Sequence, residues 1–146
     1  MEPEPRLCAI ARAAAADGPV PIEVTDGLAD HLPAAGHSMD AAVFCLVLCS
    51  VPDPAAALRE ARRILTPAGQ LRVLEHVRAD HQGLARVQRL MDATVWPVLA
   101  GGWHTCRDTV AAIERTGFTV DRLDRFLFPQ VRTPFSFHIL ASVHPR

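Results

Sequence analysis

Apolar residues change their spacing along the middle of the chain, and the change predicts a βαβ unit. Residues 40–51 are almost wholly apolar, which is typical of a strand buried on both faces of a sheet. From Asp53 to Leu65, apolar residues recur at helical spacing among charged ones, and Pro54 directly after Asp53 suits a helix start. Residues 70–77 follow a Pro-Ala-Gly turn and are predicted to form the second strand. Such a unit builds a parallel sheet, whose ligands lie at the carboxyl ends of the strands.

The segments on either side of this unit predict the rest of an α/β fold. Pro97 interrupts the long helix after the second strand, and Gly117 ends the next helix, which a Thr105–Asp108 capping pattern begins. Arg107 is expected to form a surface ion pair with Asp108 at that start. The remaining predicted elements are helices at 3–16, 82–99 and 105–117, and strands at 21–25, 118–128 and 135–144. This order favours a mainly parallel open sheet with helices on both faces and a C-terminal antiparallel strand pair.

The composition is that of an ordinary folded domain and disfavours several classes of function. The chain has 146 residues, enough for one core and too few for two, so we expect residues 1–146 to form a single domain. Hydrophobic residues make up 49%, and the formal net charge of −1 gives no electrostatic case for binding nucleic acid or an anionic membrane. No apolar run approaches the roughly 18 residues of a membrane span. All basic residues are arginine, which indicates a GC-rich genome of bacterial type.

The cysteines and histidines give no sign of a disulfide framework or a metal site. The four cysteines are Cys8, Cys45, Cys49 and Cys106. They form no C-x-x-C pair, which predicts reduced, buried thiols and a cytoplasmic location. A nucleophilic role for Cys45 or Cys49 is disfavoured because no sequence neighbour would lower the thiol pKa. His81, His104 and Cys106 match no zinc-ligand spacing, so no metal site is expected.

Three groups of residues give the chain a family resemblance. They are Leu46–Val51 (LVLCSV), Glu75–Val77 (EHV), and Trp96–Phe118 with its Gly-Gly-Trp, Arg-Asp-Thr and Gly-Phe words. In this order the sequence resembles the class I S-adenosylmethionine-dependent methyltransferases of the type 11 group, and most of all the branch that includes small-thiol methyltransferases. The resemblance covers essentially the whole chain. It implies a Rossmann-like fold, S-adenosylmethionine as methyl donor and a small-molecule acceptor, with a thiol suggested by the branch.

The resemblance also implies which residues hold the cofactor. Glu2 falls on the acidic residue that binds the ribose hydroxyls in the family, a task that suits a carboxylate because its oxygens accept hydrogen bonds. Leu28 and Ala29 occupy the loop that packs on adenine, and Cys45 and Leu46 lie where a central strand meets the cofactor, mostly through its backbone. Family members begin with a strand and a glycine-rich turn, and the chain has no such motif. We therefore expect an N-terminally truncated domain that lacks the first strand and first helix, as a fragment or as a short variant.

Ser50, Glu75 and His76 are the candidate catalytic residues on the acceptor side. They stand at the ends of the two strands of the βαβ unit, which are adjacent in a parallel sheet. Methyl transfer is an in-line displacement that needs positioned reactants and, for a protonated acceptor, the removal of a proton. His76 has the unperturbed pKa of a general base, and Glu75 would orient it or bind the acceptor. The alternative is that Glu75 and His76 are structural, one of them buried and hydrogen-bonded and the other solvated.

The sequence leaves two further interpretations open. In the first, the chain is a catalytically inactive truncated methyltransferase-like domain that folds or binds a partner without turnover. A sheet that lacks a strand exposes apolar surface and backbone edges, so we expect low solubility or self-association through that surface. In the second, the chain is a nicotinamide-dependent Rossmann enzyme, which the absence of a G-x-G-x-x-G motif disfavours.

Overall fold

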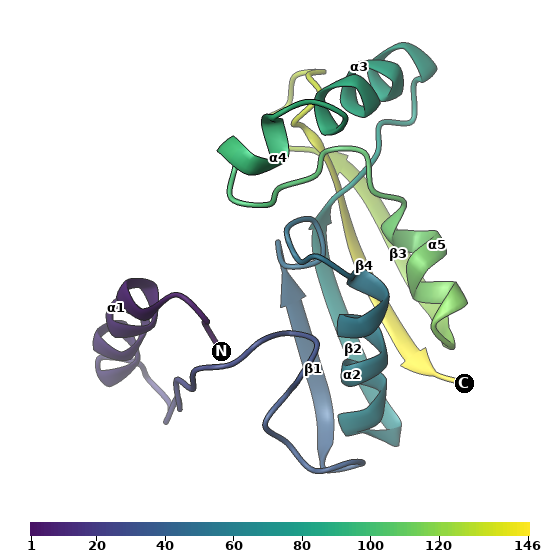
Figure 1. Ribbon diagram of the computed structural model, residues 1–146. Helices are drawn as coiled ribbons and strands as arrows, with labels where there is room; N and C mark the ends of the chain where they lie inside the picture. Colours follow the sequence, from purple (N-terminus) through teal and green to yellow (C-terminus); the bar gives the residue numbers. More distant parts are fainter.

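The computed structural model describes residues 1–146 and contains five helices and four strands (Figure 1). In chain order they are α1 (Pro5–Ala16), β1 (Met39–Cys45), α2 (Pro54–Ile64), β2 (Leu65–His76), α3 (Gln82–Asp92), α4 (Trp96–Leu99), α5 (Thr109–Arg115), β3 (Phe118–Leu127) and β4 (Phe137–Pro145). The start of α2 is capped as predicted, because the Asp53 carboxylate accepts hydrogen bonds from the N–H groups of Ala55 (2.9 Å) and Ala56 (3.1 Å). None of the helices is both long enough and apolar enough to span a membrane.

The four strands form one mixed sheet in the order β1-β2-β4-β3. β1 pairs with β2 in parallel, as the βαβ pattern predicts. β4 is antiparallel to both β2 and β3, so the C-terminal strand pair is antiparallel as predicted. This pair does not extend a mainly parallel sheet, because it makes up half of the four strands. The α/β class is confirmed. Within this chain, however, only one of the strand pairings is parallel, because β4 inserts between β2 and β3 and reverses direction.

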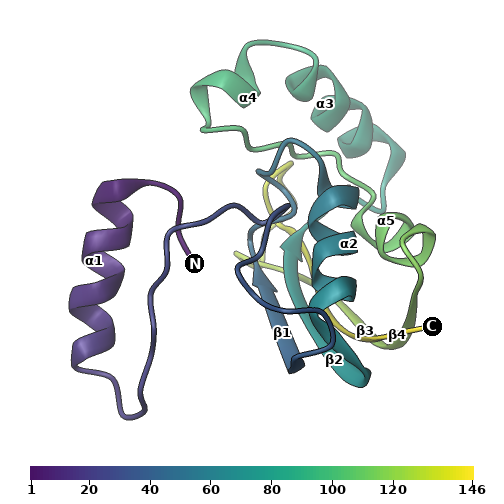
Figure 2. The ribbon, with the colours of Figure 1, turned by 60° about the horizontal axis from the view of Figure 1, so that its bottom comes forward.

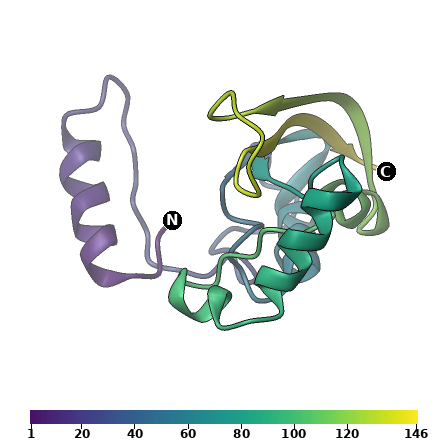
Figure 3. The same ribbon diagram turned by 90° about the horizontal axis from the view of Figure 1, so that it is seen from above.

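The helices are distributed unevenly around the sheet. α2 and α5 pack on one face, where Ala57, Leu58 and Ala61 of α2 are fully buried (Figures 1 and 2). α3 and α4 lie beyond the end of the sheet at which β1 and β2 terminate, while α1 and the loop after it stand apart, beyond β1 (Figure 3). The expected helical layer on the second face is therefore not formed by α1. The carboxyl ends of β1 and β2 thus lie near both the N-terminal segment and the α3–α4 region.

β1 is shorter than the apolar run that predicts it. The run extends over residues 40–51, but the strand ends at Cys45, because Leu46 adopts a left-handed conformation (φ 55°) and residues 47–50 form a turn. Apolar composition alone does not distinguish a buried strand from a buried turn. The turn is buried because it is packed and hydrogen-bonded beneath the α3–α4 region, where Leu48 and Cys49 are among the least exposed residues.

Several other predicted elements differ in their bounds. β2 begins at Leu65, five residues earlier than predicted, so the expected Pro-Ala-Gly turn lies within the strand. Residues 21–25 form no strand, since their one backbone hydrogen bond runs from the Glu2 N–H to the Thr25 oxygen (3.2 Å) and no neighbouring strand completes a ladder. The predicted helix over 82–99 is divided after Asp92 into α3 and α4, so Pro97 lies in the first turn of α4 instead of interrupting a helix. α5 begins four residues after Thr105, because the side chain of Asp108 caps it.

Candidate functional site

The turn after β1 is held by the carboxylate of Glu75, near the end of β2. Oε1 of Glu75 accepts hydrogen bonds from the N–H groups of Val47 (2.7 Å) and Leu48 (2.8 Å), and Oε2 accepts one from Cys49 (3.1 Å). The Glu75 side chain is fully buried. Since a buried N–H group without an acceptor is costly, this one carboxylate makes the turn possible.

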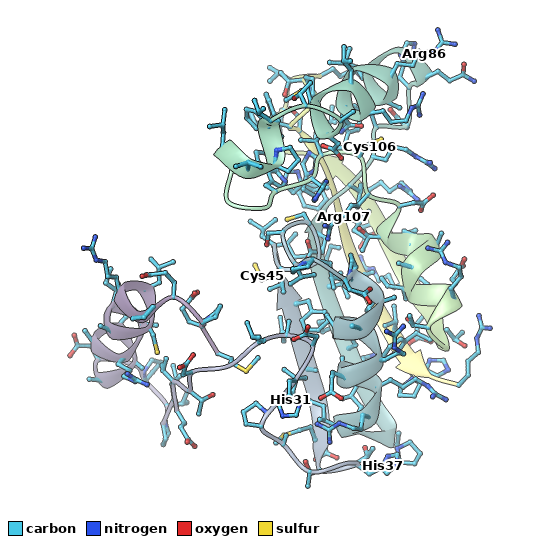
Figure 4. All side chains as sticks on the ribbon, in the orientation of Figure 1. His31, His37, Cys45, Arg86, Cys106 and Arg107 are labelled. Atoms are coloured by element: carbon cyan, nitrogen blue, oxygen red, sulfur yellow. The ribbon has the colours of Figure 1, made fainter.

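A second side chain, Arg107, binds the same turn. Its Nη1 donates a hydrogen bond to the Leu48 oxygen (2.5 Å), and the backbone N–H of His104 donates to the Cys49 oxygen (2.8 Å). Figure 4 shows Arg107 between the α3–α4 region and the ends of the strands. Its guanidinium is half-buried, and this burial lowers the pKa of Arg107, while the nearby Cys49 and Glu75 act in the opposite direction. The turn is therefore fixed through both its N–H groups and its carbonyl oxygens.

The thiol beside this carboxylate is chemically inert. Burial and the charge of Glu75 together raise the pKa of Cys49 to about 12, which keeps the thiol protonated at neutral pH. Burial also raises the pKa of Glu75, although its three N–H donors favour the ionised form. All four cysteines are free, but only Cys8 and Cys49 are buried, so the expectation of generally buried thiols is wrong for Cys45, which is exposed. The expected cytoplasmic location and bacterial source stay predictions.

A cavity of about 900 Å³ lies between the N-terminal segment and the β1 edge of the sheet. The five residues predicted to bind the cofactor all line it, although they come from three separate parts of the chain: Glu2, Leu28, Ala29, Cys45 and Leu46. Ser50, from the turn, lines it as well. Cys45 lies on the side of the sheet that faces α1 (Figure 4). The structure thus brings together one of the three predicted catalytic residues and all of the predicted cofactor residues.

His76 lies outside this cavity and is enclosed by other rings. It is 1% exposed, and its ring makes edge contacts with Trp103 (5.2 Å between centroids) and His138 (5.4 Å). Nε2 lies 3.1 Å from the Pro134 oxygen, which can only accept, so Nε2 carries the proton and Nδ1 is an acceptor without a partner. Burial lowers the pKa of His76 to about 4, assisted by repulsion from His138. The ring is therefore neutral at pH 7 and is a weak base.

Glu75 and His76 lie apart from the predicted cofactor-binding residues. Neither lines the 900 Å³ cavity, and the oxygens of Glu75 are occupied by the turn. The alternative that one of them is solvated is wrong, because both are buried. The geometry favours positioning roles for both residues, and a direct catalytic role for either stays a prediction.

Three residues that matter here have no distinctive pattern in the sequence. Arg107 was expected in a surface ion pair with Asp108, but it binds the turn, and Asp108 instead pairs with Arg78 (2.8 Å). Gln88 is fully buried and bonds the Ala79 N–H (2.7 Å). The Asp92 carboxylate accepts hydrogen bonds from the N–H groups of residues 105 and 106 (2.7 and 2.9 Å). The sequence held one signal for two of these residues: the four-residue spacing of Gln88 and Asp92 places both polar side chains on one face of α3.

The curated proteins that this chain resembles are named thiol S-methyltransferases. A family model described as a methyltransferase domain matches residues 1–73. Thiol S-methyltransferase TMT1B of Rattus norvegicus is 36% identical over 110 residues, and its counterpart in Mus musculus is 41% identical over 108 residues. In both cases the match covers 74% of this chain and 44% of the relative, so the chain spans less than half the length of these curated relatives.

Solved structures show the same fold at lower sequence identity. A SAM-dependent methyltransferase of Methanosarcina mazei superposes with a TM-score of 0.74 and 18% identity, over 99% of this chain and 79% of that one. At this identity the likeness concerns the fold. It extends over almost all of the described chain, including the N-terminal segment that lines the 900 Å³ cavity.

Proposed function

The chain belongs to the methyltransferase domain family, and from this membership we propose that it transfers a methyl group from S-adenosylmethionine to a small-molecule thiol. The observation that carries the proposal is the convergence of Glu2, Leu28, Ala29, Cys45 and Leu46 on one cavity. The matched region, residues 1–73, contains all of them. The thiol as acceptor is supported by the names of the curated relatives, which describe thiol S-methyltransferases.

The cavity fits the proposed cofactor in size and in chemistry. A volume of about 900 Å³ lies within the range of sites that enclose a ligand of this size. Glu2 Oε1 accepts a hydrogen bond from the Glu4 N–H (3.0 Å), which leaves Oε2 able to accept one from a ribose hydroxyl. Leu28 is 57% exposed and offers apolar surface to an adenine ring. These residues would hold the nucleoside part of S-adenosylmethionine.

The residues of the chain would act mainly by positioning. When bound, S-adenosylmethionine supplies a methyl group on a positively charged sulfur, which an acceptor attacks from the opposite side. The rigid turn at residues 47–50 would define one wall for that acceptor, since Ser50 lines the cavity and the turn is fixed by Glu75 and Arg107. A free thiol is a few per cent thiolate at pH 7, so the reaction does not require a strong protein base.

We assign Ser50 the contact with the acceptor and His76 a supporting role. Ser50 Oγ donates a hydrogen bond to the Val47 oxygen (3.1 Å), which leaves its lone pairs able to accept a bond from an incoming S–H group. His76 supports the aromatic cover of the sheet end through Trp103. With a pKa near 4 it would not retain a thiol proton at pH 7, so the proton would pass to solvent.

Product formation tests this proposal. The purified chain is incubated with S-adenosylmethionine labelled in its methyl group and with a small alkyl thiol, and in parallel with the alcohol of the same skeleton. We expect a labelled thioether from the thiol and no labelled ether from the alcohol. A Glu2→Gln variant should raise the KM for the donor, while Glu114→Gln, a change on the exposed face of α5, should not. Labelled ether but no thioether would contradict the thiol assignment.

We also propose that the chain self-associates through its uncovered sheet face. Cys45, Leu74 and Leu140 are in register, and Val43 precedes them on the same face of the sheet. Val43 is 67% exposed and Leu140 48% exposed. β1 is also the edge strand, with unpaired backbone groups along its outer side.

A further inference from the structure

A second cavity, of about 570 Å³, lies among α3, the start of α5 and the end of β3, and arginines dominate its charged lining. The basic residues that line it are Arg78, Arg86, Arg89, Arg107 and Arg125, and the acidic ones are Asp80 and Asp108. It shares no lining residue with the 900 Å³ cavity. Figure 4 shows Arg86 on α3 and Arg107 below it, nearer the strand ends. The two cavities are therefore separate, and we call this one the arginine cavity.

The carboxylates of the arginine cavity neutralise only part of its positive charge. Asp108 already pairs with Arg78 (2.8 Å), and Asp80 pairs with Arg132 (3.4 Å), which lies outside the cavity. None of the ion pairs of the chain involves the three remaining arginines of α3 and β3, which are Arg86, Arg89 and Arg125. Like charges around one concave site repel each other and raise the local concentration of anions.

One buried polar atom in the lining also lacks a partner. Thr109 lines the arginine cavity and is 3% exposed, yet its Oγ1 has no hydrogen-bond partner. Leaving a buried hydroxyl without a partner costs about 1–3 kcal/mol, and most such groups in native structures are satisfied by protein, water or ligand. The hydroxyl can donate to an oxygen atom placed in the cavity. This observation is independent of the charge of the arginines and points to the same place.

We propose that the arginine cavity is a binding site for a small molecule that carries a phosphate or pyrophosphate group. Guanidinium groups form paired N–H···O bonds with phosphate oxygens. The guanidiniums of Arg86, Arg89 and Arg125 together offer more N–H donors than one carboxylate group could accept, which favours a phosphate or pyrophosphate as the ligand. The open volume of about 570 Å³ accommodates such a group together with part of the molecule that bears it. A sulfonium cofactor carries a positive charge, which the arginines of this cavity would repel. The proposed ligand is therefore a different molecule from the methyl donor.

Calorimetric titration of the whole chain with sodium pyrophosphate tests the proposal, at an ionic strength held constant with sodium chloride. We expect saturable binding by the unmodified protein. An Arg86→Ala/Arg125→Ala double variant should weaken it at least tenfold. The matched control is Arg6→Ala/Arg72→Ala, which removes the same charge from exposed positions outside the cavity and should keep the affinity within twofold. Arg107 is left unchanged because it also holds the turn.

A Thr109→Val variant provides a readout that does not depend on charge. It removes the unpartnered hydroxyl at nearly constant volume, so the free protein should melt at the same temperature or higher, while pyrophosphate binds at least threefold more weakly. Absence of saturable heat with the unmodified protein would overturn the proposal. So would equal weakening in both double variants, which would show an effect of net charge alone. Binding of a single-stranded oligonucleotide that depends on Arg86 and Arg125, without binding of pyrophosphate, would also overturn the proposal. It would indicate that the ligand of the cavity is a polyanion and not a small molecule.

Discussion

At the scale of single residues, His76 combines complete burial with a ring nitrogen that has no hydrogen-bond partner. Its pKa is lowered to about 4, and the first cause is the loss of water around the ring. A histidine in the unfolded chain has a pKa near 6.5. Between these two pH values the folded protein holds the ring neutral, while the unfolded chain binds a proton.

The stability of the fold should therefore fall as the pH is lowered from about 6.5 to about 4. In this window the unfolded state binds more protons, so the free energy of unfolding rises with pH, by up to about 3 kcal/mol for this one group. Urea unfolding at several pH values measures it. A His76→Phe variant keeps an aromatic ring but cannot titrate, and its curve should be flatter across the window. Parallel curves for the two proteins would show that His76 is not held neutral in the fold.

At the scale of elements, the turn at residues 47–50 depends on contacts from distant parts of the chain. Glu75 supplies three acceptor contacts from β2, and Arg107 supplies a donor from the segment before α5. Two residues of this turn, Val47 and Ser50, line the 900 Å³ cavity. A change at Glu75 should consequently alter both stability and ligand binding, although the residue does not touch the cavity.

A series of substitutions at Glu75 should separate hydrogen bonding from charge. Glu75→Ala leaves the buried N–H groups of Leu48 and Cys49 and the part-buried one of Val47 without an acceptor, and should lower the free energy of unfolding by more than about 3 kcal/mol. Glu75→Gln keeps one oxygen, which serves Val47 and Leu48, and should cost about 1 kcal/mol. Glu114→Ala, on the exposed side of α5, is the control and should change little. Denaturant unfolding gives the three values, and equal losses for Ala and Gln would attribute the effect to charge instead.

The elements themselves were predictable where local signals suffice, and less so where distant contacts decide. The start of α2 follows from Asp53 and Pro54, whose capping chemistry is local. The end of β1 does not follow from its own residues, because the apolar run continues past Cys45 and the turn exists only through Glu75. The segment at 21–25 has strand-like composition but no neighbouring strand. A strand is defined by its partner, which composition does not reveal.

At the scale of the whole molecule, one sheet face and one sheet edge are open. Val43 and Leu140 are exposed on that face, and β1 ends the sheet with an unpaired edge. Sedimentation velocity at increasing protein concentration should show dimers or larger species, because apolar surface and unpaired strand edges favour association. A Val43→Lys/Leu140→Lys variant should shift the distribution to monomer. Val98→Lys, at an exposed position on α4, should leave the association unchanged, and a monomeric unmodified protein at every concentration would refute this prediction.

The candidate site was predictable only in part, because contacts between distant parts of the chain determine it. Glu2, Leu28 and Cys45 were assigned by resemblance, and their meeting in one cavity requires the folded chain, since they are far apart in sequence. His76 and Glu75 were placed correctly at the strand ends, but their neighbours determine their chemistry: Trp103 and His138 enclose the imidazole, and the turn occupies the carboxylate. The arginine cavity collects residues from three elements, which no linear pattern joins.

Calorimetric titration of the chain with S-adenosylhomocysteine, the product of the donor, tests whether the 900 Å³ cavity holds the cofactor. We predict saturable binding with one ligand per chain, and at least a fivefold loss of affinity in Glu2→Gln, whose carboxylate lines the 900 Å³ cavity. Glu114→Gln should bind as the unmodified protein does. No detectable binding at millimolar ligand, or binding that is indifferent to Glu2, would contradict the account of this cavity as the cofactor site.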